Sequence, residues 1–372
     1  MPVTLKSIAI LLHDFNAGGT EATALRLAAE WIAAGHRVTI IAGAADGPMR
    51  DRVPAGADVH LLSPAVPRST LSRLRLGGAM VPVLLQVAPD VAYITGNFHF
   101  WLAPAIRRAI PQLPIVAKIS NPLLPDLPAL LRAPARAALR QLTDAIDLFV
   151  AMSPELAARD AGWLPGRPIR VAPEPNLPRD HRPLPRAIAD GAPHILAIGR
   201  LEPQKDIALA LRTFAHLRAH QPARLTILGD GPDRARLEAL SQRLGIAADV
   251  AMPGFVGDVA QRLSRAACLL MTSRYEGFPA VPVEALAADV PVVTTHCSSV
   301  LRGLIATPLH GEVVADRHPA TLAAALTRAI AQPAVSGGIR PASAAPYSAP
   351  TAARRYLDIF DEAIALAPLR CK

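Results

Sequence analysis

The sequence predicts an α/β protein of two domains, each a doubly wound parallel sheet, and three observations support this. Short apolar runs alternate with helix-length segments from the first residues onward, which is typical of parallel strands joined by crossover helices. The alternation stops in a proline-rich segment and then restarts. The chain has 372 residues. Such a length suits two domains of about 150–200 residues better than one ordinary core.

The first half of the chain supplies one series of strands. A helix is expected over Thr20–Ala34, between the first two strands, because Gly35 ends its apolar period. Consecutive parallel strands separated by such helices form a doubly wound sheet. The strands are expected at Ser7–His13, Val38–Ala42, Val91–Thr95, Ile115–Ile119 and Leu148–Met152.

A hinge rich in proline follows, because six prolines fall between Pro173 and Pro193 without any apolar period. A second irregular segment is expected over Gln332–Pro350, followed by an amphipathic helix over Thr351–Ala365. The second series of strands is expected at His194–Ile198, Arg224–Leu228, Leu269–Thr272 and Val290–Thr294. The predicted divisions are a first domain at 1–175, the hinge at 176–193, a second domain at 194–348 and a final helical segment at 349–372.

Composition excludes several classes of protein. Hydrophobic residues make up 51% of the chain and charged residues 19%, which excludes a disordered chain. The net charge of +9 is spread over both halves, and no basic–aromatic platform occurs, so no nucleic-acid partner is expected. The cysteines lack metal-type spacing, and we find no signal peptide or bilayer-length apolar run. These features predict a cytoplasmic protein that at most lies on the inner face of the membrane.

The strongest functional signal is a pair of glutamates eight residues apart, Glu276 and Glu284, after a buried strand. Gly277 and Pro279 exclude a helix that begins at Glu276, so this carboxylate is expected on a loop at the carboxyl end of the strand. Pro282 fits the first position of a helix and would place Glu284 in its opening turn. The free N–H groups of such a turn suit a phosphate, and the carboxylates suit sugar hydroxyls. Two structural glutamates are the alternative.

A second signal follows the first strand of the second domain, where Gly199 and Arg200 precede Lys205. Arginine offers a fork that matches phosphate oxygens, and lysine offers a mobile point charge. Arginine supplies 35 of the 39 cations, so a lysine here indicates a site that requires an ammonium group. A solvated charged loop is the alternative. In the first domain, Gly18 and Gly19 join the first strand to the first helix, where a ligand could approach the backbone closely.

The order and spacing of these motifs resemble those of the retaining, nucleotide-sugar-dependent glycosyltransferases of family 4. The resemblance covers essentially the whole chain, is specific over 194–295, and is looser before residue 175. It implies the GT-B fold, in which two Rossmann-like domains face each other across a cleft and the last helix crosses back to the first domain. The motifs are Gly18-Gly19, Gly199-Arg200 through Lys205-Asp206, Gly229-Asp230-Gly231-Pro232, Gly254-Phe255 and the pair Glu276 and Glu284.

The resemblance also implies roles for these residues. Arg200, Lys205 and Glu276 would form the catalytic set: the two cations would bind the donor diphosphate, and the glutamate would contact the transferred sugar. No D-x-D triplet occurs, so neither a metal nor another cofactor is expected. The further donor-binding residues would be Gly18, Gly19, Gly199, the backbone of Phe278, Pro279, Ala280 and Val281, and Glu284 for the ribose hydroxyls.

The sequence departs from the family pattern at two places. Asn121 stands where the family often has a histidine, and it cannot act as a base at neutral pH. Cys297-Ser298-Ser299 resembles a variant found among transferases that use UDP-hexoses or UDP-N-acetylhexosamines, which favours a UDP donor. On the acceptor side, His99 follows the expected strand Val91–Thr95, where it would meet an acceptor together with Asn121. A local structural histidine is the alternative.

Two basic stretches suggest where the acceptor binds. Arg136 and Arg140 lie one helical turn apart after Pro134, at an expected helix start, and Arg68, Arg73 and Arg75 form the other stretch. They are expected either to contact anionic lipid or a lipid-diphosphate acceptor, or to be a solvated face.

The predicted activity is therefore transfer of a hexose-type sugar from a nucleotide sugar to a saccharide or lipid-linked acceptor in cell-surface glycan biosynthesis, with retention. Three alternatives stay open: a nucleotide-sugar epimerase of the same fold, a phosphorylase, which would need a cofactor-bearing lysine, and a donor-binding protein without activity.

Overall fold

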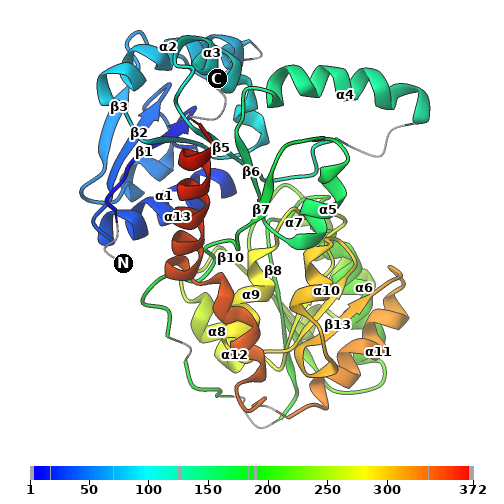
Figure 1. Cartoon of the computed structure of the whole chain (residues 1–372). Coiled ribbons are helices and arrows are strands. Elements are labelled where there is room, and N and C mark those ends of the chain that lie inside the picture. The colour runs from blue at the N-terminus through cyan, green and yellow to red at the C-terminus, as the bar shows by residue number, and fades with distance from the viewer. Residues whose placement is uncertain are drawn as a thin grey trace. The chain divides into compact units, whose positions relative to one another are not determined.

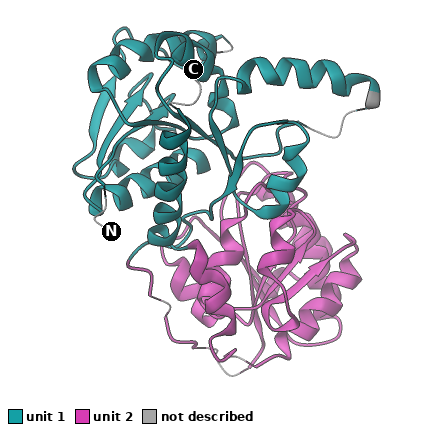
Figure 2. Ribbon diagram, in the orientation of Figure 1, with its two compact units in different colours: residues 1–179, 348–372 teal, residues 180–347 magenta. Residues whose placement is uncertain are grey.

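The computed structural model describes residues 4–16, 18–69, 71–124, 128–182, 184–187, 191–333 and 335–367. The chain divides into two compact units, shown in Figures 1 and 2. Unit 1 contains residues 1–179 and 348–372, and unit 2 contains residues 180–347. The chain thus enters unit 2 at residue 180 and returns to unit 1 at residue 348.

Unit 1 is built on a parallel sheet with the strand order β3-β2-β1-β4-β5-β6-β7, which confirms the predicted α/β class. All five predicted strands form, each within one residue of its predicted ends. The edge strands β3 and β7 were not predicted, because they are short and only partly buried and so have no continuous apolar run. The strands are β1 (Ser7–Leu12), β2 (Arg37–Ala42), β3 (Asp58–Leu61), β4 (Val91–Ile94), β5 (Ile115–Ile119), β6 (Leu148–Ala151) and β7 (Ile169–Val171).

One helix of unit 1 begins at a different residue from the one predicted. Pro134 does not begin a helix: it lies inside α4, which starts five residues earlier at Ala129 after the capping residue Pro128. An internal proline removes a single backbone hydrogen bond, and an exposed helix such as α4 can bend to accommodate it. The helices are α1 (Gly19–Ala33), η1 (Pro48–Arg52), α2 (Ser72–Val87), η2 (Asn97–Leu102), α3 (Ala103–Ala109), α4 (Ala129–Thr143), α5 (Pro154–Ala161) and α13 (Ala349–Leu366).

The last helix, α13, completes the core of unit 1. Trp31 on α1 packs against Tyr356 and Phe360 on α13, with ring centroids 6.1 and 5.2 Å apart. The Trp31 indole N–H also donates a 3.1 Å hydrogen bond to the backbone oxygen of Ala353. Buried aromatic pairs of this kind add to the free energy gained from the buried area itself. The end of the chain is therefore a structural part of the unit that the beginning of the chain forms.

Unit 2 contains the second parallel sheet, with the order β10-β9-β8-β11-β12-β13. The four predicted strands correspond to β8, β9, β11 and β12. The edge strands β10 and β13 were not predicted as strands: both are only partly buried, and β10 also contains a proline. The strands are β8 (His194–Ile198), β9 (Arg224–Leu228), β10 (Val250–Gly254), β11 (Cys268–Met271), β12 (Val292–Thr295) and β13 (Gly311–Val314). The helices are α6 (Ile207–Arg218), α7 (Arg234–Arg243), η3 (Ala247–Asp249), α8 (Val259–Arg265), α9 (Ala280–Ala287), α10 (Val300–Leu304), η4 (Pro308–His310), α11 (Pro319–Ile330), α12 (Ile339–Ala344) and η5 (Ala345–Tyr347).

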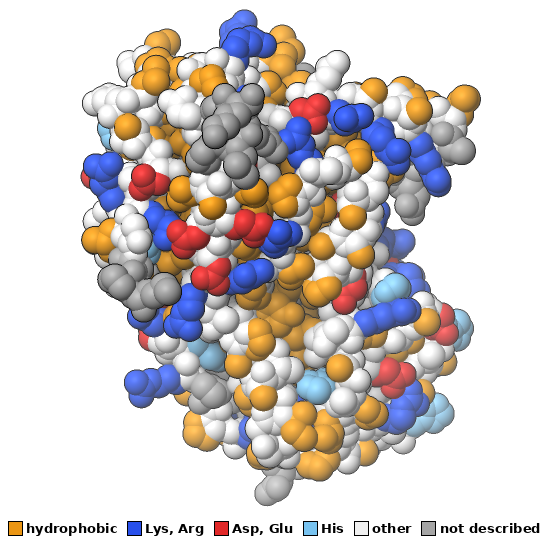
Figure 3. Space-filling view, viewed as in Figure 1, with side chains coloured by type: hydrophobic (Ala, Val, Ile, Leu, Met, Phe, Trp, Pro, Cys, Tyr) orange, Lys and Arg blue, Asp and Glu red, His pale blue; other side chains and the backbone are white. Residues whose placement is uncertain are grey.

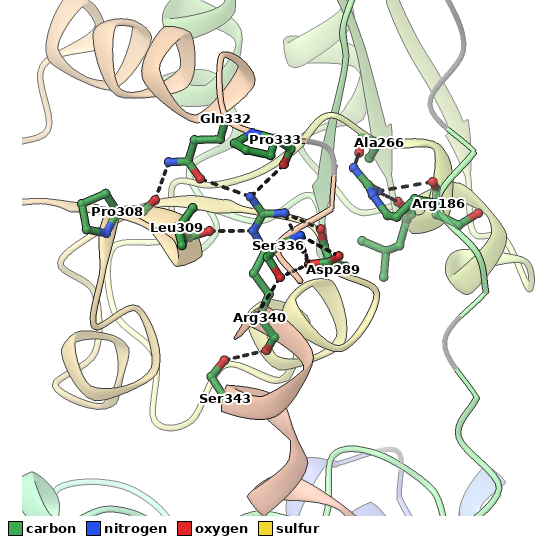
Figure 4. A network of polar contacts seen from close by, with 12 residues as sticks. Arg186, Ala266, Asp289, Pro308, Leu309, Gln332, Pro333, Ser336, Arg340 and Ser343 are labelled. Carbon is green, nitrogen blue, oxygen red and sulfur yellow. Dashed lines mark hydrogen bonds and ion pairs between the residues drawn. The ribbon is translucent and has the colours of Figure 1, made fainter. Parts of the chain in front are cut away.

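The segment Gln332–Pro350 is not irregular throughout, because it contains α12 and η5. Its anchor is Arg340, whose side chain is fully buried. The guanidinium donates to the backbone oxygens of Asp289 (2.8 Å) and Leu309 (2.6 Å), as Figure 4 shows. Arg340 also forms an ion pair with the carboxylate of Asp289, at 3.4 Å. One buried arginine therefore holds a helix whose small and polar residues gave no helical pattern.

The connection into unit 2 is also anchored by an arginine. Arg186 donates to the backbone oxygen of Leu263 in the last turn of helix α8 (3.0 Å). It also donates to the backbone oxygen of the capping residue Ala266 (2.7 Å), as Figure 4 shows. The last carbonyls of a helix lack partners within the helix, so the guanidinium satisfies them. Burial lowers the pKa of Arg186 to about 10.

Replacing Arg340 with methionine should destabilise the protein by about 3–5 kcal/mol, because the substitution leaves Asp289 as a buried carboxylate without its cation. Equilibrium urea unfolding of the full chain measures this change. Arg302→Met, at an exposed position of the same unit, serves as the control and should stay within about 0.5 kcal/mol of the parent. A loss in Arg340→Met no larger than in the control would contradict this assignment.

Candidate functional site

The candidate site of unit 2 lies where the winding of its sheet reverses. Strand β8 pairs with β9 on one side and β11 on the other, so β8 and β11 flank the switch point. In open α/β sheets, ligands bind beyond the carboxyl ends of the strands at this position. The loop after β8 carries Arg200 and Lys205, and the loop after β11 carries Glu276. The topology therefore brings the predicted catalytic residues to one edge of the sheet.

Lys205 and Glu276 are in direct contact. The lysine Nζ lies 2.6 Å from Oε1 of Glu276, and the two side chains are 22% and 9% exposed. Arg200 behaves differently, because its side chain is 65% exposed and pairs with Glu202 at 2.9 Å. Two of the three predicted catalytic residues thus form a fixed pair, while the third is free to reorient toward a ligand.

A pocket of about 300 Å³ adjoins this pair. Its lining includes Gly199, Arg200 and Lys205. The remaining lining is mostly apolar and includes Phe255, whose side chain is 90% exposed. A lining that combines two cations with apolar side chains suits a ligand that combines an anionic group with a flat apolar ring. The other apolar lining residues are Ile198, Leu228, Val256 and Val259.

Glycine is required at the base of this pocket. Gly229 has φ of +132°, and a Cβ atom there would lie 2.1 Å from the backbone oxygen of Gly199. A side chain at position 229 would therefore push apart the turns that follow β8 and β9. Gly199 and Gly229 therefore allow the turns that follow β8 and β9 to approach each other closely.

Residues that depart from the family pattern hold the loop that carries Glu276. The backbone N–H of Glu276 donates to the oxygen of Cys297 at 2.8 Å, and the Ser298 hydroxyl donates to the oxygen of Gly277 at 2.9 Å. Burial, and then the nearby Glu276 carboxylate, raise the pKa of the Cys297 thiol to about 11. A thiol with a raised pKa favours its protonated form, and Cys297 contributes its backbone oxygen to this loop.

Arg317 is a site residue that the sequence analysis missed. Its guanidinium donates to the backbone oxygens of Thr272 (2.8 Å) and Ser273 (2.7 Å) and forms an ion pair with Asp206 at 2.8 Å. Asp206 follows Lys205 directly and has a left-handed backbone conformation, with φ of +44°. Arg317 thus ties the end of β11 to the loop after β8. No motif surrounds it, so only the packing of distant segments shows its role.

Helix α9 begins earlier than predicted. Its first residue is Ala280, and Pro279 is the capping residue, so Pro282 occupies the third helical position. Glu284 is therefore in the second turn and not in the opening turn, which corrects the prediction. Because Pro282 has no N–H, the free backbone donors of the first turn are those of Ala280 and Val281. The Phe278 ring, just before the helix, packs against Tyr347 with centroids 5.1 Å apart.

Unit 1 has a switch point of its own, between β1 and β4. Gly18 caps helix α1, and Gly19 is its first residue, so both lie at the carboxyl end of β1. His99 follows β4 and is buried, with Nδ1 3.5 Å from the Thr95 hydroxyl. Asn121 is exposed, and its backbone oxygen accepts a 2.7 Å hydrogen bond from the side chain of Asn97. His99 and Asn121 therefore differ in exposure, although both follow strands of the same sheet.

Two other findings concern only the residues that the structure describes. Among them we find no group of three or more histidine, cysteine, aspartate or glutamate side chains able to hold a metal ion. None of the described helices is long and apolar enough to cross a membrane. Cys371 and Lys372 lie outside the described residues.

Two protein families match the chain, one in each unit. The family described as Glycosyltransferase Family 4 matches residues 17–175, and that described as Glycosyl transferases group 1 matches residues 182–342. Among curated relatives, the uncharacterized glycosyltransferase MJ1607 of Methanocaldococcus jannaschii is 32% identical over 145 residues, which is 38% of this chain and 37% of that protein. A diphospho-undecaprenol 4-alpha-N-acetylgalactosaminyltransferase of Campylobacter jejuni is 34% identical over 110 residues, 30% of each chain. The matches thus span only 37% and 30% of the length of these two relatives.

Solved structures match over nearly the whole length. The lipopolysaccharide outer core galactosyltransferase WaaB superposes with a TM-score of 0.75 at 20% identity, covering 96% of this chain and 99% of WaaB. Anabaena HepE, solved in complex with UDP and glucose, gives a TM-score of 0.73 at 16% identity and covers 96% and 100%. At these identities the likeness concerns the fold, and it confirms the expected GT-B fold.

The buried imidazole of His99 should make stability depend on pH. Burial lowers the pKa of His99 to about 3 from an ordinary value of 6.5. The unfolded chain therefore takes up a proton as the pH falls through 6.5 while the folded chain does not, so folding loses about 2 kcal/mol between pH 7 and pH 5. His99→Gln should remove about that much of the pH dependence measured by urea unfolding. The exposed His318→Gln is the control; equal pH dependence in all three proteins would refute the assignment.

Proposed function

The chain belongs to the glycosyltransferases that carry a family 4 domain and a group 1 domain, and we propose that it transfers a hexose-type sugar from a UDP-sugar to a saccharide or lipid-linked acceptor in polysaccharide biosynthesis. The observation that carries the proposal is the Lys205–Glu276 pair at the switch point of unit 2, beside a pocket lined by two cations and by apolar side chains. The relatives named above support the acceptor class, since one of them acts on a diphospho-undecaprenol saccharide by name.

The two cations would assist departure of the nucleotide. When the bond between sugar and phosphate breaks, negative charge grows on the diphosphate, and fixed positive groups lower the barrier by stabilising that charge. Lys205 has three N–H donors and uses one for Glu276, so two remain for phosphate oxygens. Arg200 is exposed enough to turn from Glu202 to the ligand, and the free N–H groups of Ala280 and Val281 would add to this cradle.

Glu276 would bind the transferred sugar. Lys205 holds one of its carboxylate oxygens, and the other is available for a sugar hydroxyl. Glu284 would contact the ribose, and Gly18 and Gly19 would contact the sugar and diphosphate part of the donor. We propose retention at the transferred carbon through a front-face reaction, in which the leaving phosphate takes the proton of the acceptor hydroxyl. Such a reaction needs no protein base, which agrees with Asn121 at the position where the family often has a histidine.

The pocket beside Lys205 supports a nucleotide as the leaving group. Phe255 is the most exposed aromatic side chain among the described residues and lines this pocket, so its ring can stack on a base. UDP is the proposed nucleotide because of the Cys297–Ser299 variant, and the structure of HepE with UDP and glucose is consistent with it.

A thermal-shift screen with UDP-, GDP- and ADP-sugars tests the proposed donor. UDP-sugar at about 100 times its Kd should stabilise the chain by roughly 2.7 kcal/mol, and the other two should stabilise it less. Lys205→Ala should abolish this gain and lower kcat for transfer by roughly 100-fold, a loss of the size seen when one oxyanion contact is removed. Arg236→Ala, an exposed position of the same unit, is the control.

Three outcomes would count against the proposal. Stabilisation by UDP-sugar that persists in Lys205→Ala would place the donor elsewhere. Epimer formation from donor alone would favour an epimerase. Unchanged output of the biosynthetic pathway in cells that carry Lys205→Ala or Glu276→Ala would favour a donor-binding protein without activity.

Helix α4 supports an acceptor at a membrane surface. Figure 1 shows α4 projecting from the rest of unit 1, and Leu130 and Leu131 on it are 87% and 49% exposed. The helix contains three arginines at four-residue spacing, Arg132, Arg136 and Arg140, and no acidic residue. Figure 3 shows basic and hydrophobic side chains next to each other along this projection. Exposed leucines beside a row of cations match an anionic lipid surface, which we place at the inner face of the membrane.

Vesicle co-sedimentation tests this surface. The chain should bind phosphatidylglycerol-containing vesicles and not pure phosphatidylcholine vesicles. Arg136→Gln with Arg140→Gln should weaken binding by roughly 30-fold, since each cation near an anionic surface contributes about 1 kcal/mol. Arg52→Gln with Arg108→Gln, at exposed positions elsewhere in unit 1, is the matched control. Equal binding by both double variants would contradict the role of α4.

A further inference from the structure

Arg68 stands apart from the basic stretch to which the sequence assigns it. Arg73 lies over the ring of Phe98, 3.3 Å from its centroid, and Arg75 is exposed. Arg68 instead turns toward the loop between β1 and α1. Its Nε and Nη2 donate to the two oxygens of Asp14, at 2.5 and 3.0 Å, and Nη2 also donates to Glu21 at 2.9 Å. One guanidinium therefore bridges two carboxylates.

These carboxylates depend on Arg68 for their charge balance. Their side chains are only 4% and 6% exposed, whereas Arg68 is 40% exposed. Among the described residues, no other lysine or arginine forms an ion pair with either of them. Burial would raise the pKa of Asp14, but the hydrogen bonds from Arg68 and from the N–H of Asn16 hold that pKa below its ordinary value. Without Arg68, two buried negative charges would lie close together with no cation beside them.

Both carboxylates also shape the turn that carries Gly18 and Gly19. Asp14 accepts a hydrogen bond from the N–H of Asn16 at 3.1 Å, and the oxygen of Asn16 accepts one from the N–H of Gly18 at 2.8 Å. From the other side, Oε2 of Glu21 lies 2.2 Å from the point that a Cβ atom on Gly18 would occupy. The turn is therefore packed between two side chains that a single arginine holds.

We infer that Arg68 is a positioning residue, which orders the Gly18–Gly19 turn and offsets the charge of Asp14 and Glu21 so that the turn can accept the anionic diphosphate of the donor. The inference rests on the proposed function, in which this turn contacts the donor. Glu21 lies in the first turn of α1, where an unpaired carboxylate would repel an anion that approaches the helix N-terminus. With Arg68 in place, the three side chains carry one net negative charge, and without it they would carry two.

The first test measures the order of the turn and does not depend on the activity. Hydrogen–deuterium exchange of peptides covering residues 13–22 should be about tenfold faster in Arg68→Met than in the parent, because opening of this segment becomes less costly. Arg75→Met, a neighbouring exposed arginine, is the matched control and should leave the exchange unchanged. Exchange in Arg68→Met equal to that in the control would overturn the inference whether or not the chain transfers a sugar.

The second test uses steady-state transfer from the UDP-sugar. Arg68→Met should raise the donor KM about tenfold, as expected for an added unscreened charge near an anion, with a smaller change in the acceptor KM. Arg68→Lys, which keeps the charge, should recover part of the loss. Adding Glu21→Gln to Arg68→Met should also lower the donor KM again, because it removes one of the uncompensated carboxylates.

The two tests separate failure of this inference from failure of the proposed function. A parent chain that neither binds nor uses any nucleotide sugar would refute the proposed function, while the exchange experiment would still decide whether Arg68 orders the turn. An active parent whose donor KM is unchanged in Arg68→Met, or not restored by Glu21→Gln, would refute the positioning role. Unfolding midpoints show whether each variant folds. If Arg68→Met does not fold, the single variant Glu21→Gln, which preserves side-chain size, takes its place in the exchange test.

Discussion

The reversal of winding beside the central strand of each sheet is the constraint on which the rest of the structure depends. Parallel strands need crossover helices. Where the strand order reverses, the loops at the carboxyl ends of the two neighbouring strands diverge and leave room for a ligand. In unit 2 this occurs between β8 and β11, and in unit 1 between β1 and β4. Lys205 and Glu276 lie 71 residues apart in the sequence and meet only because their strands are neighbours at that point. The loops at these two places carry most of the proposed site residues.

Among the described residues, lysine occurs in ion pairs with carboxylates and not only beside the proposed phosphate site. Each of the three described lysines pairs with a carboxylate: Lys6 with Asp361 at 3.0 Å, Lys118 with Glu174 at 2.6 Å, and Lys205 with Glu276 at 2.6 Å. Lys118 and Glu174 are both almost fully buried, so their pair is structural. The scarcity of lysine therefore does not by itself single out Lys205. What distinguishes Lys205 is its place at a switch point and beside a pocket.

Much of the fold could be predicted from local hydrophobic patterns in the sequence, and the strands and helix that were not predicted share a cause. Central strands such as β1 and β8 are buried on both faces, so each forms a short apolar run that is visible in the sequence. Edge strands such as β3 and β13 are half exposed and have no such run. Helix α12 was missed because it has no apolar stripe, whereas the buried Arg340 that anchors it contacts residues distant in the sequence.

The sequence by itself determined the α/β class and the family, and it predicted Arg200, Lys205 and Glu276 as site residues, because strand periodicity and short motifs are local properties of the chain. Only the tertiary structure decided which groups the cations contact. Lys205 pairs with Glu276, and Arg200 is exposed. Arg68 pairs with Asp14, and Arg317 donates to the backbone at the end of β11. The physical reason is that an ion pair between distant segments depends on which loops the sheet brings together, and neither arginine count nor spacing contains that information.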